Sequence, residues 1–256
     1  MTRWALLLEY DGTPFVGWQR QVNGLSIQAV LERAATYLNG GQPVASVAAG
    51  RTDSGVHAEG QVAHMDLPDR HNAKSVREAL NYHMKPHPVV VVNAVVVPGG
   101  WSARFSADQR AYRFRILNRR SRPALMNGRV WHVPAPLDTD AMHTAAQRLV
   151  GLHDFTSFRA ASCQARSPVR TLERLDVTRY GDLIEIVTEA RSFLHHQVRN
   201  FVGTLKLVGE GSWPAERVTA ALQARHRAAA GPTAPPDGLT LIRVSYPDDP
   251  FGNRIS

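Results

Sequence analysis

The sequence predicts an α+β fold, in which strands and helices follow one another in mixed order rather than in strict alternation. Three observations lead to this prediction. Apolar residues after Ser26 recur at helical spacing, a valine-rich run spans 89–97, and a turn signal at 179–182 separates two apolar stretches. With 256 residues and 43% hydrophobic side chains, the chain is long enough for two domains with packed cores.

Local signals predict each element of the first half. Ser26 is a typical helix N-cap, and Gly40-Gly41 ends the helix that it starts. The run at 89–97 is rich in β-branched residues, which favour strands. The predicted order is a strand at 3–10, a helix from Ser26 to Gly40, a turn-bearing segment at 44–65, a helix near 73–83 and a strand at 89–97.

The second half has a similar order of elements. Its predicted elements are a helix from Asp138 through Val150, a hairpin of 172–178 and 183–190, a helix over about 193–208, a helix opened by Pro214 and a strand at 239–246. Gly99-Gly100 and the basic segment 104–122 are the best candidates for a boundary between the halves. We therefore predict two α+β domains, at 1–104 and 105–256.

Composition narrows the classes of function. The formal net charge is +8 and the sequence pI about 10.2, which favours a polyanionic partner. A single cysteine, Cys163, excludes an intrachain disulfide and a cysteine-based zinc site. The run at 89–97 is far shorter than the roughly 20 residues of a membrane span. The apolar run from Trp4 to Leu8 is too short for a signal peptide, so a cytoplasmic protein is expected.

No pattern typical of a cofactor or metal site is present in the sequence. A phosphate-binding glycine loop and a zinc motif such as HExxH are both missing, so we expect neither a cofactor nor a metal. His57 and His64 flank the turn described next, and His195-His196 begin the predicted late helix. We interpret these histidines as packing residues or nucleic-acid contacts.

The segment 49–58 (AGRTDSGVHA) places one carboxylate, Asp53, in a tight turn beside Arg51. Gly50 and Gly55 supply the backbone freedom that such a turn needs. A neighbouring guanidinium favours the charged form of a carboxyl group, so Asp53 suits a nucleophile better than a proton donor. On spacing alone, an Asx-type turn with a surface salt bridge explains the segment about equally well.

The same turn resembles the active-site motif of aspartic proteases. That chemistry needs two carboxylates that share a proton. The sequence contains no second Asp-Thr-Gly or Asp-Ser-Gly, which excludes a single-chain protease of this type. A homodimeric, retroviral type stays open, although such chains are much shorter.

Five groups of residues, taken in order, resemble one known family. They are 10–21 (YDGTPFVGWQRQ), 50–66 (GRTDSGVHAEGQVAHMD), 103–107 (ARFSA) with Tyr112-Arg113-Phe114, Ser192-Phe193-Leu194 with Val198-Arg199-Asn200, and 234–239 (APPDGL). Through these motifs almost the whole chain resembles the TruA-type tRNA pseudouridine synthases. Gln197 and Ser54 depart from the family pattern, in which methionine and alanine are common at these positions.

The resemblance implies roles for five residues. Asp53 corresponds to the catalytic aspartate, Arg199 to an arginine that pairs with it, and Tyr112 to a tyrosine placed against the target base. Arg51 is implied to hold the flipped nucleotide, and Arg104 to bind the substrate. On spacing alone, a surface arginine with a buried stem is by far the commoner explanation of Arg199, and an ordinary half-buried strand is the favoured explanation of Tyr112.

The resemblance also implies a fold and an activity. The expected fold has two related domains with mostly antiparallel sheets, joined across a basic active-site cleft. The expected reaction converts uridine to pseudouridine at positions 38, 39 and 40 in the anticodon stem-loop of tRNA, by base flipping and an aspartate nucleophile. The family is homodimeric and needs no cofactor. The alternative from another functional class is a non-catalytic RNA-binding module that kept the fold.

Overall fold

The computed structural model describes residues 1–252, which form two compact units. The first unit contains Met1–Arg110 together with the chain from Leu241 onward, and the second contains Ala111–Thr240. This division differs from the predicted domains at 1–104 and 105–256, because the C-terminal strand belongs mainly to the first unit. Residues 253–256 of the predicted second domain lie outside the described part of the chain.

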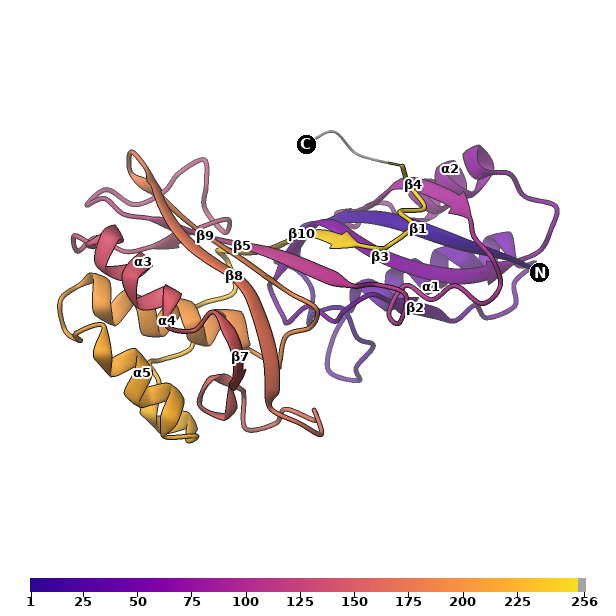
Figure 1. Ribbon diagram of the computed structural model, residues 1–256. Coiled ribbons are helices and arrows are strands. Elements are labelled where there is room, and N and C mark those ends of the chain that lie inside the picture. The colour runs from indigo at the N-terminus through magenta and orange to yellow at the C-terminus, as the bar shows by residue number, and fades with distance from the viewer. Residues whose placement is uncertain (253–256) are drawn as a thin grey trace. The chain divides into compact units, whose positions relative to one another are not determined.

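Antiparallel strands form the centre of the first unit (Figure 1). β1 (Thr2–Tyr10) pairs with β3 (His57–Leu67) on one side and with β4 (Val89–Val96) on the other. Leu6 stands opposite Ala63 of β3 and Ala94 of β4. β2 (Ser46–Ala48) pairs with β3, and β10 (Leu239–Ser245) is the next neighbour of β3 in strand order. As the central strand, β1 buries every side chain from Trp4 to Leu8.

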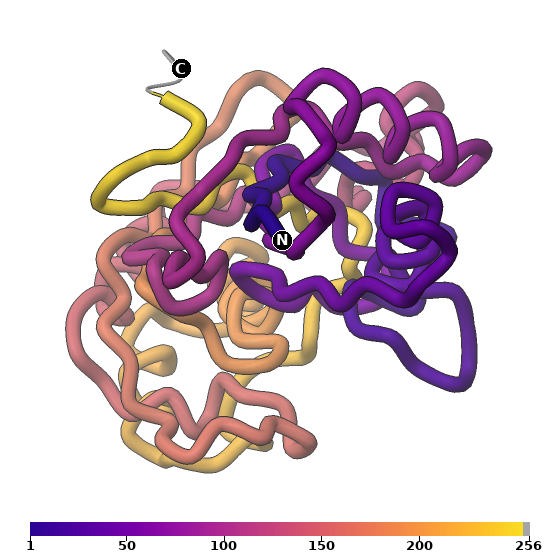
Figure 2. Tube along the Cα trace, turned by 90° about the vertical axis from the view of Figure 1, so that its right-hand side faces the viewer, coloured from indigo at the N-terminus to yellow at the C-terminus, as the bar shows by residue number. Residues whose placement is uncertain are grey.

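Two helices pack beside these strands (Figure 2). α1 (Ile27–Leu38) begins as predicted at Ser26, whose hydroxyl accepts from the Ala29 amide at 3.2 Å. α2 (Ala73–Met84) begins at Asn72, which exchanges two hydrogen bonds with Ser75 in a capping box. α1 packs against α2, and α2 against β4. The helical spacing of apolar residues in 27–38 therefore marks a buried face, as expected.

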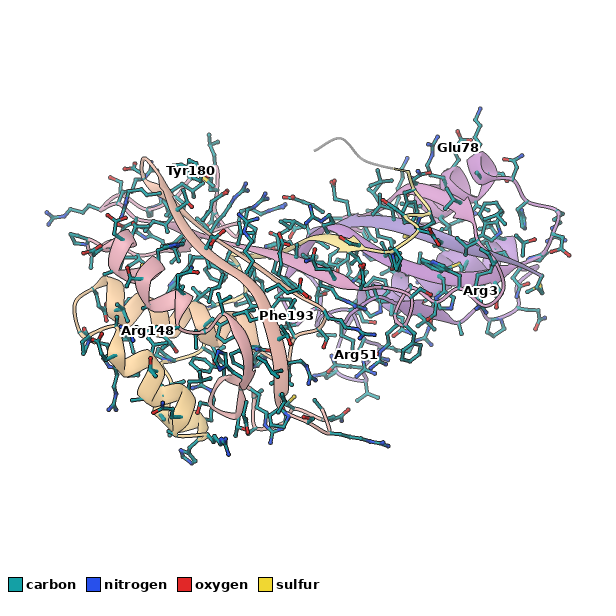
Figure 3. All side chains as sticks on the ribbon, in the orientation of Figure 1. Arg3, Arg51, Glu78, Arg148, Tyr180 and Phe193 are labelled. Atoms are coloured by element: carbon teal, nitrogen blue, oxygen red, sulfur yellow. The ribbon has the colours of Figure 1, made fainter. Side chains whose placement is uncertain are left out.

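The second unit also contains a mostly antiparallel sheet with helices beside it. β5 (Gln109–Leu117), β9 (Leu183–Ala190), β8 (Val169–Tyr180) and β7 (Gly151–Asp154) neighbour one another in this order, and β6 (Trp131–His132) pairs in parallel with β5. β8 and β9 form the predicted hairpin, in which Tyr180 stands opposite Leu183 and Gly181 has a φ of +59°. Figure 3 shows Tyr180 at the tip of this hairpin.

Helices pack beside the second sheet, and a cluster of aromatic rings forms part of the core of this unit. α3 (Thr139–Gln147) packs on β8, α4 (Gln197–Gly209) packs on α3, and α5 (Glu216–Gln223) follows. Two short 3-10 turns, η1 (Thr156–Phe158) and η2 (Arg227–Ala229), contact each other. The rings of Phe155, Phe158 and Phe201 pack together, with the closest centroids 5.1 Å apart.

The structure confirms the α+β prediction and corrects the bounds of two helices. α3 ends at Gln147 rather than at Val150, because the chain turns into β7 at Gly151, whose φ is +111°. The late helix begins at Gln197 rather than near 193, because His196 has a left-handed φ of +61°. Within residues 1–252, no helix has both the length and the apolar composition that a membrane crossing requires.

Candidate active site

Asp53 lies in a turn whose form follows from Gly55. The carbonyl of Asp53 accepts from the Val56 amide at 3.2 Å, and Gly55 has a φ of +78°, as the third residue of a type II turn requires. Asp53 is half-buried. Arg51 extends into solvent from the same segment, as Figure 3 shows. We call residues 49–56 the Asp53 loop.

Groups outside the Asp53 loop fix its backbone. Three of its carbonyl groups accept hydrogen bonds from a buried side chain of β5, a buried side chain of β3 and an amide of the opening motif. These are Ala49 with Arg110 Nη2 at 2.7 Å, Gly50 with Gln61 Nε2 at 2.9 Å, and Thr52 with the Trp18 amide at 3.0 Å. These bonds hold the backbone that carries Asp53 at several points, which is the kind of support that a catalytic group requires.

A buried tyrosine supports the same loop from β1. The hydroxyl groups of Tyr10 and Thr52 are 2.9 Å apart, and Gln61 donates to Tyr10 at 3.3 Å. Burial raises the pKa of Tyr10 to about 12, so its hydroxyl is neutral at physiological pH. Tyr10 therefore links the strand that opens the chain to the residue next to Asp53.

The opening motif at 10–21 closes around the Asp53 loop because two of its residues lack a side chain. A Cβ atom on Gly12 would collide with the carbonyl oxygen of Val56. A Cβ atom on Gly17, whose φ is +104°, would lie 2.7 Å from the carbonyl oxygen of Thr52. The backbone carbonyl of Phe15 also accepts a hydrogen bond from the Ser54 hydroxyl at 3.2 Å. The serine that departs from the family pattern thus adds a contact between the two motifs.

Arg104 lies on a second fixed loop of the first unit, residues 102–107, which we call the Arg104 loop. Ser102 and Ser106 close it, since the Ser102 amide donates to the Ser106 hydroxyl and the Ser106 amide donates to the Ser102 carbonyl. The Arg104 guanidinium lies 5.4 Å from the ring centroid of Phe105, which is 77% exposed. An exposed cation over an exposed ring is suited to phosphates and unstacked bases.

Two buried side chains hold the Arg104 loop at Ala103. His64 Nδ1 accepts from the Ala103 amide at 3.1 Å, and the Tyr246 hydroxyl donates to the Ala103 carbonyl at 2.8 Å. Burial lowers the pKa of His64, the charge of Arg3 lowers it further, and Asp66 acts in the opposite direction. An Nδ1 atom that accepts a hydrogen bond carries no proton, so this contact requires the neutral ring that burial favours.

Tyr112 lies on β5 in the second unit. Its side chain is 8% exposed, and its ring meets that of Phe193 edge to face with centroids 5.3 Å apart. Phe193 comes from one of the motifs that carry the family resemblance, in the segment just before α4. The sequence did not indicate this pairing, because the two residues are far apart along the chain.

Arg199 lies in the first turn of α4. Its Nε atom donates to the carbonyl of Ala234 at 2.8 Å, which ties the late helix to the segment 234–239. At the first residue of the helix, the buried side chain of Gln197 accepts from the Leu194 amide at 2.7 Å. The glutamine that departs from the family pattern thus shapes the start of α4. The predicted site residues divide between the units, and the pairing of Arg199 with Asp53 stays a prediction.

Known proteins match this chain along nearly its whole length. A family model described as tRNA pseudouridine synthase matches residues 145–247. The tRNA pseudouridine synthase A of Acidiphilium cryptum is 68% identical over 252 residues, covering 98% of this chain and 99% of its own. The chain belongs to the tRNA pseudouridine synthase family.

Other members of the tRNA pseudouridine synthase family are almost as similar. The tRNA pseudouridine synthase A of Paramagnetospirillum magneticum is 60% identical over 96% of this chain and 96% of its own. That of Gluconobacter oxydans is 56% identical over 98% of this chain and 92% of its own. The family and the enzyme class that the motifs predicted are therefore confirmed. Sequence reasoning missed Gln61 and Arg110, whose burial beside the Asp53 loop becomes visible only in the folded chain.

Proposed function

We propose that this protein isomerises uridine to pseudouridine at positions 38, 39 and 40 in the anticodon stem-loop of tRNA, with Asp53 as the nucleophile. The observation that supports this proposal most is the Asp53 loop. It holds one carboxylate on a backbone whose carbonyls at Ala49, Gly50 and Thr52 are bonded from outside the loop. The names of the relatives, all tRNA pseudouridine synthase A, support the substrate class.

The proposed reaction moves one bond within the nucleotide. The bond between the ribose carbon C1′ and uracil N1 breaks, and a bond between C1′ and uracil C5 forms. The C5 proton leaves and N1 gains a proton, so atoms balance and no oxidant or cofactor is consumed. Asp53 attacks either the base or the sugar, and both routes use the same carboxylate. The uridine leaves the helical stack first, at a cost of a few kcal/mol.

The remaining site residues have distinct proposed roles. Arg199 pairs with the Asp53 carboxylate, an interaction that its guanidinium, oriented by Ala234, can support. Tyr112 stacks on the extruded base and its hydroxyl takes part in removing the C5 proton. Arg51 holds the flipped conformation, and the exposed Arg104 binds the RNA backbone.

The charge of the chain supports a nucleic-acid partner and its mode of binding. A net charge of +8 attracts the tRNA backbone, and binding releases the counterions condensed on it, so the affinity falls steeply as the salt concentration rises. We further propose that the protein acts in the cytoplasm as a homodimer, so that one tRNA contacts both subunits.

Pure protein and defined transcripts test this proposal. In each transcript of one set, just one of the positions 38, 39 and 40 is a uridine. A matched control transcript has cytidine at all three positions and keeps all of its other uridines. We expect one pseudouridine per molecule in the first set and none in the control. Binding without conversion would instead identify an RNA-binding module, and equal conversion in the control would exclude the proposed positions.

A further inference from the structure

We propose that Arg110 is a positioning residue that couples the Asp53 loop to the Arg104 loop, an inference that rests on the proposed function for its effect on catalysis. Arg110 lies in β5 and is the last residue of the N-terminal segment of the first unit. It is only 8% exposed. Its Nη2 atom donates both to Ala49 of the Asp53 loop at 2.7 Å and to Arg104 of the second loop at 2.8 Å.

One nitrogen atom therefore joins the backbones that carry the proposed nucleophile and a proposed substrate-binding arginine. The Nη1 atom donates in addition to the Ala107 carbonyl at 3.1 Å, at the other end of the Arg104 loop. A guanidinium is planar and its donors point in fixed directions. The positions of the three carbonyl groups are consequently set relative to one another and not only relative to the sheet.

The other supports of these loops act differently. Gln61 holds Gly50 of the Asp53 loop, whereas His64 and Tyr246 hold Ala103 of the Arg104 loop. Each of these bonds ties one loop to a strand or to the C-terminal segment. Arg110 contacts both loops at once, so its loss would release their relative placement even where each loop stays attached to the unit.

The planar guanidinium of Arg110 makes lysine a poor replacement. Burying a charged group is costly unless hydrogen bonds compensate it, and three backbone carbonyls do so here. A lysine ammonium is a compact point charge on a flexible stem and does not reproduce the planar fork. Arg110→Lys keeps the charge while removing the bridge, which makes it the direct test.

Arg3→Lys provides a matched control in the same unit. Arg3 also donates to backbone carbonyls, those of Gly99 and Trp101, and pairs with Asp66 at 2.9 Å. These contacts lie next to the Arg104 loop but do not include the Asp53 loop. A lysine at this position therefore perturbs the neighbouring backbone without touching the proposed bridge.

The first experiment measures amide hydrogen exchange of the full chain by mass spectrometry and needs no activity. In Arg110→Lys we expect exchange to accelerate at least about tenfold in the peptides that cover 49–56 and also in those that cover 102–107. In Arg3→Lys we expect acceleration near 99–103 and unchanged exchange in 49–56. Unchanged exchange of 49–56 in Arg110→Lys would overturn the coupling. Arg110→Gln, which removes the buried charge and keeps an amide donor, is measured in parallel in case lysine prevents folding.

The second experiment measures single-turnover conversion of a tRNA transcript and the affinity for that transcript. We expect Arg110→Lys to slow conversion at least about tenfold at saturating enzyme, and Arg3→Lys to stay within about twofold of the unmodified chain. A conversion rate of Arg110→Lys equal to that of Arg3→Lys would overturn the positioning role of Arg110 in catalysis. If the unmodified chain converts no uridine, the proposed function fails, while the exchange experiment still decides whether Arg110 couples the two loops.

Discussion

Arg199 and Ala234 are joined by two hydrogen bonds of opposite direction. The Ala234 amide donates to the Arg199 carbonyl at 3.1 Å, and Arg199 Nε donates to the Ala234 carbonyl at 2.8 Å. The first bond fixes the segment 234–239 against α4, and the second orients the guanidinium plane. Because Nε donates its hydrogen bond to Ala234, we expect the predicted ion pair with Asp53 to use the two Nη atoms.

This orientation makes Arg199→Lys a sensitive test of the predicted ion pair. Lysine keeps the positive charge but loses both the contact to Ala234 and the two-pronged approach to a carboxylate. Loss of one hydrogen bond to a charged group costs about 1.5–3 kcal/mol, which corresponds to conversion slower by a factor of roughly 10 to 160. Single-turnover conversion of a tRNA transcript measures the effect.

Arg148→Lys is the matched control for Arg199→Lys. Arg148 belongs to the same unit and forms an ion pair with the exposed Glu216 at 2.6 Å. Exposed pairs contribute little to stability, so this variant should convert uridine at the normal rate. Near-normal conversion in Arg199→Lys would exclude the specific ion pair with Asp53.

Replacing Tyr112 by phenylalanine separates stacking from proton transfer. The variant keeps the ring that packs edge to face on Phe193 and removes only the hydroxyl group. We expect tRNA affinity to hold while turnover falls by about 10²–10⁴, the usual contribution of a general acid or base. Tyr180→Phe, at the exposed hairpin tip, is the control. Normal turnover in Tyr112→Phe would show that the ring acts by stacking alone.

Gly17→Ala should disturb the Asp53 loop from the opening motif. A side chain at this position meets the Thr52 carbonyl oxygen at 2.7 Å and must adopt a φ of +104°. Left-handed strain alone costs about 1–3 kcal/mol, so we expect the free energy of unfolding to fall by at least about 2 kcal/mol.

Denaturant unfolding of Gly17→Ala and of Gly100→Ala measures this loss. A Cβ atom at Gly100 would meet no atom within 4 Å, so the control should change stability by less than about 0.5 kcal/mol. Equal stabilities of the two variants would contradict the close approach of the opening motif to the Asp53 loop.

The contact between His64 and Ala103 predicts a pH dependence of stability. Burial keeps the pKa of His64 below the 6.5 of an exposed histidine, so between the two values the unfolded chain binds a proton that the folded chain does not. Stability is therefore fully present above about pH 6.5 and declines as the pH falls, by at most about 1.4 kcal/mol for each pH unit.

His64→Asn isolates this contribution, because the amide oxygen can accept from Ala103 without titrating. We expect the free energy of unfolding of the unmodified chain to decrease more than that of the variant between pH 7.5 and 5.5. Parallel pH profiles for the two proteins would show that His64 is not the titrating group.

Local chemistry made much of the fold predictable. Ser26 and Asp138 were correctly predicted as N-caps, and the residues around Gly181 form the predicted hairpin. The late helix was predicted to start too early, because Leu194 and Val198 stand at helical spacing. The left-handed backbone of His196 and the side chain of Gln197 interrupt that pattern, and no local propensity indicates them.

Long-range contacts account for what the sequence did not predict at the site. Gln61 and Arg110 are polar residues within strands, and their burial depends on carbonyl groups that come from other parts of the chain. The return of the chain from Leu241 into the first unit is likewise a tertiary feature. The motifs pointed to Asp53 and Arg104, but only the fold indicates which groups hold their loops.

Conversion of tRNA by Asp53→Asn, measured under single turnover beside tRNA affinity, tests the central claim most directly. Asparagine has nearly the same shape as aspartate but is a poor nucleophile. We predict that conversion slows by at least about 10³-fold while affinity changes by less than about threefold. Pseudouridine formation by Asp53→Asn at a rate comparable to that of the unmodified chain would contradict the assignment of Asp53 as the nucleophile.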